Sequence, residues 1–160
     1  MLTFLSSAKI PGMPGYAQDL PLLLLAAAAE VTDAIHHGTV AAGFTDIRPS
    51  HGFAFVRMAP NGATVGELAE HLSVTKQAAS QLVDELVKKG YAQRNPHPSD
   101  ARAKLITLTE RGWACTRAAD AAAARFTERW LATLGPAATV ELRNTLARVV
   151  IPGRVRPSAW

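Results

Sequence analysis

Residues 64–108 constrain the fold more strongly than any other stretch of this sequence. Thr64-Val-Gly-Glu67 has the spacing of a capping box, in which the Thr hydroxyl accepts the N–H three residues further on and the Glu carboxylate accepts the Thr N–H. The box predicts a short helix that ends near Leu72. Thr75 is placed to cap a second helix, which Gly90 ends. The stretch is therefore predicted to begin with two helices joined by a tight turn.

The second helix has two chemically different faces. Its apolar residues recur at the i, i+3, i+4, i+7 spacing of a helix with one buried side; they are Ala79, Leu82, Val83 and Leu86. The opposite side is polar and consists of Gln77, Ser80, Gln81, Asp84 and Lys88. We therefore expect the apolar face to join the core and the polar face to contact something outside the chain.

Two short strands are predicted after this helix, over residues 91–94 and 104–108. The segment that joins them, residues 95–103, is too polar to be core and too long for a tight hairpin turn. Two helices, a tight turn and a hairpin with an extended loop make up a winged helix-turn-helix, a module that places one helix in a DNA major groove.

Helices are also predicted on both sides of this module. Asp19 can cap a helix that runs to about residue 42, and Pro49 lies in the first turn of a helix over residues 47–58. Thr109 is expected to cap a long helix ending near Leu134, and residues 137–150 form the last one. The fold class is therefore mainly α with a small β-hairpin wing.

These elements divide the chain into four parts. Residues 1–18 are expected to form a flexible N-terminal arm and residues 19–62 the N-terminal dimerisation and support helices. Residues 63–112 are the winged helix-turn-helix, and residues 113–160 hold the C-terminal dimerisation helices and tail. The block 20–29 is apolar nearly all round, and a chain of this size cannot surround it, which indicates a second subunit.

Charge and cysteine content limit the function classes. The net charge is +4, yet residues 63–112 carry seven basic and six acidic side chains, so a DNA-binding role depends on where the charges lie. A single cysteine, Cys115, permits no disulfide within the chain. The N-terminus lacks the pattern of a secretory signal, and residues 20–29 are too short to span a bilayer. We expect a cytoplasmic protein with no membrane partner.

The run from Thr64 to Arg94, continued by residues 100–112, resembles the MarR family of bacterial transcriptional regulators. Asp100-x-Arg102 followed by Leu108-Thr-x-x-Gly112 is the most specific part of the resemblance. Two positions depart from the family pattern. Ser73 stands where the family usually has glycine, which costs about 1–2 kcal/mol if the turn needs a positive φ. Ala101 stands where a second wing cation is usual, which removes one phosphate contact.

The residues predicted to contact DNA lie on the second helix and the hairpin. Lys76 is suited to a phosphate or guanine, Gln77 and Gln81 can pair with adenine, and Ser80 lets the helix approach closely. The resemblance implies that Arg102 probes the minor groove, with Asp100 orienting it or pairing with Arg94. The full predicted set is Thr75, Lys76, Gln77, Ser80, Gln81, Arg94, Asp100, Arg102 and Lys104. The alternative for each of them is an ordinary solvated surface residue without a role in DNA binding.

Small molecules and metals receive separate predictions. The family often binds small aromatic ligands between its dimer helices and its DNA lobe, and His51, Phe55, Arg57 and Trp113 are the candidates for such a cleft. The five histidines lack the spacing of a helical metal site, so we expect neither a metal nor a cofactor. Cys115 is interpreted as a buried structural thiol rather than a redox sensor. No catalytic motif is present, and we predict no enzyme.

Together these features predict a homodimeric, sequence-specific DNA-binding transcriptional regulator. It is expected to act as a repressor on a pseudo-palindromic operator of double-stranded DNA and to be released by a small ligand. The alternative is a winged-helix protein–protein interaction module that has lost DNA binding. Affinity for random DNA with almost no salt dependence would distinguish this alternative from a regulator.

Overall fold

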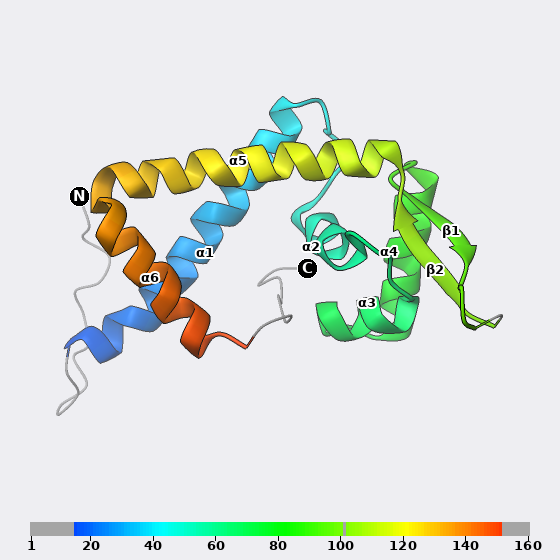
Figure 1. Ribbon diagram of the computed structural model, residues 1–160, viewed down its shortest axis with the longest axis horizontal. Helices are drawn as coiled ribbons and strands as arrows, with labels where there is room; N and C mark the ends of the chain where they lie inside the picture. Colours follow the sequence, from blue (N-terminus) through cyan, green and yellow to red (C-terminus); the bar gives the residue numbers. More distant parts are fainter. Residues whose placement is uncertain (1–14, 101, 152–160) are drawn as a thin grey trace.

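The computed structural model describes residues 15–100 and 102–151. Its elements, in order, are α1 (Gly15–Ala41), α2 (Pro49–Met58), α3 (Val65–Leu72), α4 (Lys76–Lys88), β1 (Ala92–Pro96), β2 (Lys104–Leu108), α5 (Glu110–Leu134) and α6 (Pro136–Val149). A compact lobe with the hairpin lies at one end of the long α5, and α1 and α6 accompany α5 toward the other end (Figure 1). The mainly α fold with a hairpin wing is confirmed.

We call residues 44–115 the winged lobe and residues 15–43 and 116–151 the helical arm. The core cluster lies within the winged lobe, between Ile47 and Cys115. It includes the four apolar residues predicted on α4, all of which are buried: Ala79, Leu82, Val83 and Leu86. Tyr91, fully buried, completes the packing between α4 and the start of α5.

Three helices of the lobe and its boundary are capped by local hydrogen bonds at the residues that the sequence predicts. The N–H of Glu67 donates to Thr64 Oγ1 at 3.2 Å, and the N–H of Thr64 donates to Glu67 Oε2 at 2.8 Å. Thr75 Oγ1 accepts the N–H of Ala78 at 3.1 Å, and Thr109 caps α5 in the same way. These bonds satisfy amide groups that have no partner inside the helix.

The turn between α3 and α4 is left-handed at Ser73, with φ 54° and ψ 43°. Its N–H donates to the carbonyl of Glu70 at 3.1 Å, and the N–H of Val74 donates to Ala69 at 2.9 Å. An L-residue in this conformation places its Cβ close to its own backbone, at a cost of about 1–2 kcal/mol. The turn therefore keeps a geometry that favours glycine even though it holds serine.

The hairpin is shifted relative to the prediction. β1 covers Ala92–Pro96 rather than residues 91–94, and Pro96 pairs with Lys104. Tyr91 lies outside the strand because its N–H donates to Leu86 at the end of α4 and its carbonyl accepts the N–H of Thr109. The loop of the wing is thus residues 97–103, shorter than the predicted 95–103.

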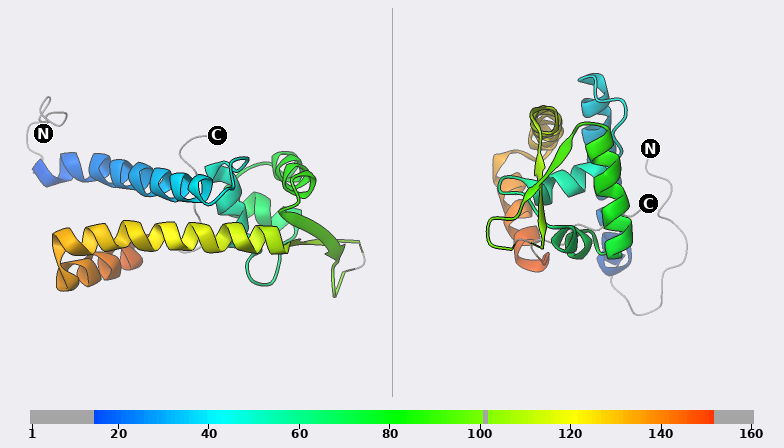
Figure 2. Two further views of the ribbon diagram at one scale, coloured as in Figure 1. Left: turned by 90° about the horizontal axis from the view of Figure 1, so that it is seen from above. Right: turned by 90° about the vertical axis from the view of Figure 1, so that its right-hand side faces the viewer.

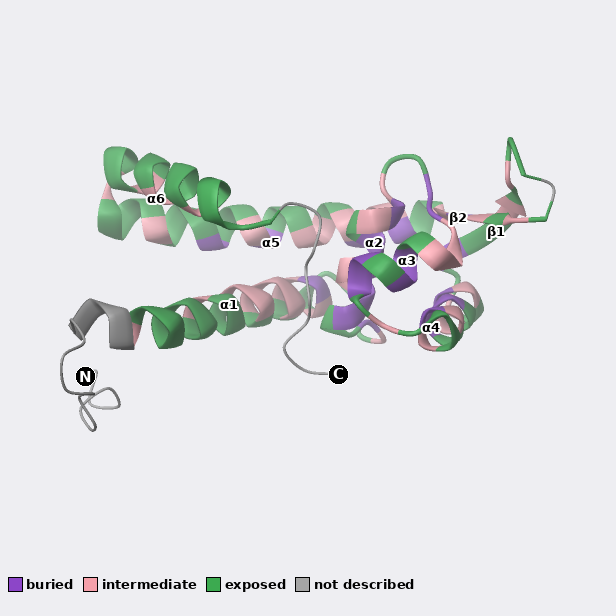
Figure 3. Ribbon diagram, turned by 90° about the horizontal axis from the view of Figure 1, so that it is seen from below, coloured by how far each residue is buried: buried purple, intermediate pink, exposed green. Residues whose placement is uncertain are grey.

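The helical arm is much less buried than the lobe. α1 and α5 extend away from the lobe in two adjoining layers (Figure 2) and cross at an angle (Figure 1), and α6 turns back from the end of α5. Large apolar side chains on the outer half of α1 are exposed, among them Leu22 at 54% and Leu25 at 60%, and α6 has no buried residue. Figure 3 shows the contrast between the mostly exposed arm and the buried inner face of the lobe.

Two predictions about the arm need adjustment. α1 begins at Gly15, so Asp19 lies inside the helix instead of capping it, and Pro21 is also internal. No helix-breaking residue separates Gly15 from Asp19, so the helix extends further toward the N-terminus than predicted. Residues 1–14 of the predicted flexible arm and the tail 152–160 lie outside the described residues. Within the described part, no helix is both long and apolar enough to cross a membrane.

Candidate nucleic-acid interface

α4 presents an exposed polar face opposite its buried stripe. Thr75, Lys76, Gln77 and Gln81 are exposed, and Ser80 is half-buried between them. All five belong to the first turns of the helix or its cap. In helix-turn-helix proteins these N-terminal positions of the recognition helix contact base edges. The predicted base-reading residues are therefore brought together on one accessible surface.

The wing adds cations at the far end of the hairpin. Arg102 and Lys104 are exposed, and so is Asp100. Asp100 Oδ1 accepts the backbone N–H of Arg102 at 2.9 Å, a turn that fixes the loop backbone next to the arginine. Asp100 therefore orders the backbone at Arg102, and its role in orienting the arginine toward DNA stays a prediction. Ala101, where the sequence suggested a lost phosphate contact, lies outside the described residues.

Arg94 has a partner that the sequence did not indicate. Its Nη2 donates to Asp84 Oδ1 at 2.6 Å, which links β1 to α4. The prediction offered Asp100 as the partner of Arg94, but Asp100 is engaged with the turn at Arg102. Because Asp84 offsets its charge, Arg94 contributes less to a positive surface than Lys76, Arg102 and Lys104.

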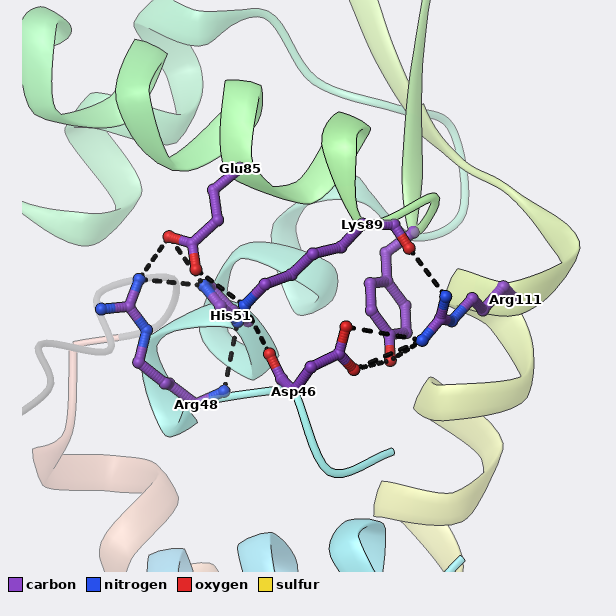
Figure 4. Close-up of polar contacts among 7 residues, drawn as sticks. Asp46, Arg48, His51, Glu85, Lys89 and Arg111 are labelled. Atoms are coloured by element: carbon purple, nitrogen blue, oxygen red, sulfur yellow. Dashed lines mark hydrogen bonds and ion pairs between the residues drawn. The ribbon is translucent and has the colours of Figure 1, made fainter. Parts of the chain in front are cut away.

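A network of charged residues connects α4 to the rest of the lobe (Figure 4). Glu85 on α4 is paired with Arg48 at the start of α2 and with Lys89 at 2.7 Å. His51, with no exposed surface, accepts the backbone N–H of Arg48 at Nδ1, and its Nε2 lies 3.5 Å from Glu85 Oε2. In the neutral ring the proton is therefore assigned to Nε2, which faces the carboxylate.

A second set of contacts joins the α1–α2 connection to α5. Tyr91 Oη donates to Asp46 Oδ1 at 2.6 Å, and Arg111 Nη2 donates to Tyr91 Oη at 3.0 Å. The guanidinium of Arg111 also lies 4.3 Å from the centre of the Tyr91 ring. Apart from the local pairs Arg48–His51 and Glu85–Lys89, the partners in both sets are far apart in sequence, and no local pattern predicts them.

Burial and hydrogen bonding shift the pKa values of several groups in these two sets of contacts. Burial lowers the pKa of His51 below 6.5, opposed by Glu85, which favours the charged ring. The bond from Lys89 lowers the pKa of Glu85, and the bond from Tyr91 lowers the pKa of Asp46. Burial and the Asp46 contact raise the pKa of Tyr91 to about 12. Near neutral pH the carboxylates are therefore charged and Tyr91 remains a hydrogen-bond donor.

A largely apolar cavity of about 230 Å³ lies between α1, α2 and α5. Of the four residues predicted to bind a ligand, Phe55 lines this cavity. His51 belongs to the charged network, Arg57 is paired with Glu67, and Trp113 packs against the lobe core. The residues that line it are Val31, Thr32, Ile35, His36, Thr39, Ile47, Arg48, Pro49, Gly52, Phe53, Phe55, Val56, Cys115, Ala119, Asp120 and Ala123.

The sequence also raised the remaining histidines and Cys115 as candidates for metal or redox chemistry. Among the residues that the structure describes, no group of three or more His, Cys, Asp or Glu side chains could hold a metal ion. Cys115 is buried and lines the cavity. Burial raises the pKa of its thiol to about 11, so the thiol stays protonated and unreactive at neutral pH.

Comparison with known proteins supports the same architecture. A family model described as MarR family matches residues 53–103. The transcriptional activatory protein BadR of Rhodopseudomonas palustris is 35% identical over 52 residues, which are 32% of this chain and 30% of BadR. The chain spans less than two thirds of the length of the curated relatives it matches.

Two solved structures extend the likeness to nearly the whole chain. RV1404 of Mycobacterium tuberculosis superposes with a TM-score of 0.71 at 23% identity, over 96% of this chain and all of that one. CouR of Rhodococcus jostii RHA1, solved with bound p-coumaroyl-CoA, has a TM-score of 0.67 at 25% identity, over 88% of this chain and 97% of CouR. Together with the capped helices, the left-handed turn and the wing, these findings show a winged helix-turn-helix fold and a similarity to the MarR family.

Proposed function

We propose that this protein is a homodimeric, sequence-specific DNA-binding regulator and not an enzyme. The observation that carries the proposal is the division of α4 into a fully buried apolar stripe and an exposed face. That face offers amide, hydroxyl and ammonium groups, namely those of Thr75, Lys76, Gln77, Ser80 and Gln81. Such groups can donate to and accept from base edges in the major groove. The network behind α4 would hold this face in a fixed orientation.

The cations of the interface are few, and their distribution suggests their roles. Lys76 at the start of α4 would contact a phosphate, and Arg102 at the wing would enter the minor groove. Lys104 would support the wing from β2. Since each phosphate contact releases counterions, operator affinity should fall steeply with salt concentration. Two half-sites in a dimer would double the limited charge of one lobe.

Dimerisation is supported by the exposed apolar surface of the arm. Leu20, Leu22, Leu23, Leu24 and Leu25 are each about half exposed or more on one helix. A second apolar groove, lined by α1, α5 and α6 residues such as Trp130, Leu142 and Leu146, continues this surface. Large contiguous apolar patches usually mark a protein interface. A second copy of the chain would bury them and set the spacing of the two recognition helices.

We also propose that the cavity between α1, α2 and α5 takes a small aromatic ligand. Its volume of about 230 Å³ and its apolar lining suit a compact aromatic molecule, and CouR, of the same fold, is known with p-coumaroyl-CoA bound. A ligand releases DNA only if it binds better to the conformation with low DNA affinity. Repression remains a prediction, because BadR is a transcriptional activatory protein and α4 would bind DNA in the same way for either sign.

Selection of bound sequences from random DNA tests the proposal, followed by anisotropy titrations of the best sequence at several salt concentrations. We expect a pseudo-palindromic site and a steep salt dependence. Arg102→Ala should weaken operator binding while leaving the oligomeric state and the unfolding transition unchanged. Equal affinity for selected and random DNA with almost no salt dependence would instead indicate a protein-interaction module.

A further inference from the structure

Arg48 lies between the cavity and the recognition helix. It lines the cavity between α1, α2 and α5, and it also lines a separate groove of about 480 Å³ between α2 and α4. That groove includes Gln81, one of the residues proposed to contact bases, and Glu85. Of the residues that line either hollow, Arg48 and its neighbour Pro49 line both. A movement of Arg48 would therefore alter both the cavity and the groove beside α4.

The backbone of Arg48 and its guanidinium make contacts of different strength. Its backbone N–H is bound to His51 Nδ1 at 3.1 Å and fixes the start of α2. Its guanidinium pairs with Glu85 on α4, yet 61% of this side chain is exposed. Exposed ion pairs contribute little net free energy, because water competes for both charges. The backbone of Arg48 is thus fixed, whereas its guanidinium can exchange one anionic partner for another at small cost.

The polar groups around the cavity favour an acid. Arg48 is the one Lys or Arg side chain among the lining residues, and Asp120 is the one carboxylate. A guanidinium can bind a carboxylate through two parallel N–H bonds, which Lys or an amide cannot reproduce. In addition, His36 Nδ1 is buried and makes no hydrogen bond within the described part of the chain, so it offers a second polar anchor.

We propose that Arg48 couples the cavity to α4: the anionic group of a small aromatic acid bound in the cavity competes with Glu85 for the guanidinium. The inference rests on the proposed function. Once Arg48 turns to the ligand, Glu85 retains Lys89 on its own helix and the longer contact with His51 Nε2 at 3.5 Å, and α4 loses its ion pair with Arg48 at the start of α2. The recognition helix becomes more mobile, and its affinity for the operator falls.

Hydrogen–deuterium exchange of residues 76–88 tests the coupling without DNA. The probes are 2-naphthoate and its uncharged isostere 2-naphthamide, with binding of each followed by its fluorescence. We expect naphthoate to bind the wild type and to speed exchange in α4, and naphthamide to leave exchange unchanged. Arg48→Gln should show the faster exchange already and gain nothing from naphthoate. Failure of naphthoate to bind, or equal effects of the two probes, would overturn the proposal.

A matched control separates this role from a general loss of ion pairing. Arg57 forms a comparable ion pair with Glu67 in the same lobe but does not line the cavity. Arg57→Gln should therefore keep the full response of α4 to naphthoate. A response lost equally in the Arg57 and Arg48 variants would show that Arg48 has no special part.

Operator binding supplies the second arm of the test. Naphthoate should weaken the binding of wild-type protein to the selected operator about fivefold or more, in the usual range of allosteric coupling. In Glu85→Gln it should still bind but no longer change operator affinity; an unaltered response in this variant would contradict the coupling. If wild-type protein shows no specific DNA binding, the proposed function fails, and the exchange experiment still decides the role of Arg48.

Discussion

The winged lobe and the helical arm both consist mainly of helices, but they bury their apolar side chains to very different extents. In the lobe, several apolar side chains have no exposed surface: Leu68, Leu72, Val83 and Leu86. Ion pairs also join α4 to the start of α2 and to β1. In the arm, α6 has no buried residue, and Leu25 on α1 is 60% exposed. The lobe therefore draws its stability from contacts within the chain.

The difference indicates where a second chain would act in the proposed dimer. Apolar area contributes to stability only when it is removed from water, and much of the arm's apolar area is still exposed in one chain. A dimer would supply the missing burial without altering the lobe. Dissociation should then leave a folded lobe on a loosened arm, and the stability of the arm should depend on protein concentration.

The largest expected effect is on the arm. Leu25→Glu places a charge where the partner would cover a leucine, and the symmetric interface loses two such side chains. At about 1.5–3 kcal/mol for each buried leucine, the dimer should be weakened by about 3–6 kcal/mol. Sedimentation velocity should show monomers with most of the far-UV helix signal retained.

Leu25→Met is the control, because it keeps an apolar side chain of similar size and should remain dimeric. A Leu25→Glu protein that sediments as the wild type would mean that the outer half of α1 is covered in some other way.

The next effect compares two glycines at close contacts. A Cβ on Gly112 would lie 2.2 Å from the carbonyl oxygen of Tyr91 in the lobe, and one on Gly38 would lie 2.3 Å from the Cβ of Ala122 in the arm. Gly112→Ala should cost about 1–3 kcal/mol or more, since the packed backbone of the lobe cannot move away. Gly38→Ala should cost less, because its contact is with the Ala122 side chain on a separate helix and α1 and α5 can move apart slightly.

Urea unfolding of both variants measures this contrast. Gly52→Ala is the control in the same lobe: nothing lies within 4 Å of its added Cβ, and the substitution should stabilise α2 by about 0.5–1 kcal/mol. Equal losses at Gly112 and Gly38 would show that the arm is as tightly constrained as the lobe.

The sequence predicted the parts of the lobe that depend on local chemistry. Thr64, Thr75 and Thr109 cap helices through bonds to residues three positions away, and such spacings are visible in a sequence. The buried stripe of α4 follows from helix periodicity in the same way. These features also fixed the surface on which the DNA-contact candidates lie.

Contacts between distant residues could not be predicted in this way. The bond between Tyr91 and Asp46 joins residues 45 positions apart, and the pair of Arg94 and Asp84 depends on how β1 packs against α4. Nothing in the local pattern distinguishes Asp84 from Asp100 as the partner of Arg94. For the same reason the sequence selected Arg57 and Trp113 for the ligand, whereas Arg48 and His36 line the cavity.

The buried His51 should make the stability of the lobe depend on pH. Its pKa is lowered in the folded protein, mainly by burial, so the unfolded chain binds the proton more readily. Its contribution is therefore complete above about pH 6.5 and is lost as the pH falls toward the lowered value. Protonation at Nδ1 would also replace the acceptor of the Arg48 N–H with a donor.

His51→Gln provides the comparison, because its side-chain oxygen can still accept the Arg48 N–H but does not titrate. Urea unfolding at a fixed protein concentration, from about pH 7.5 to about pH 5, should show a steeper loss of stability in the wild type than in the variant. The other histidines are common to both proteins. Parallel curves would assign the pH dependence to groups elsewhere, including those in the arm.

The smallest effect is expected at the turn before α4. Ser73→Gly removes the penalty of a left-handed L-residue but also makes the unfolded chain more flexible, so the net gain should be about 0.5–1 kcal/mol. This gain should raise the unfolding free energy of the lobe and leave the dimer affinity of the arm unchanged, because the turn is hydrogen-bonded to α3 and packs against the core of the lobe. A stabilisation that appears equally in dimer dissociation would show that the two regions are coupled and are not the independent parts that their burial indicates.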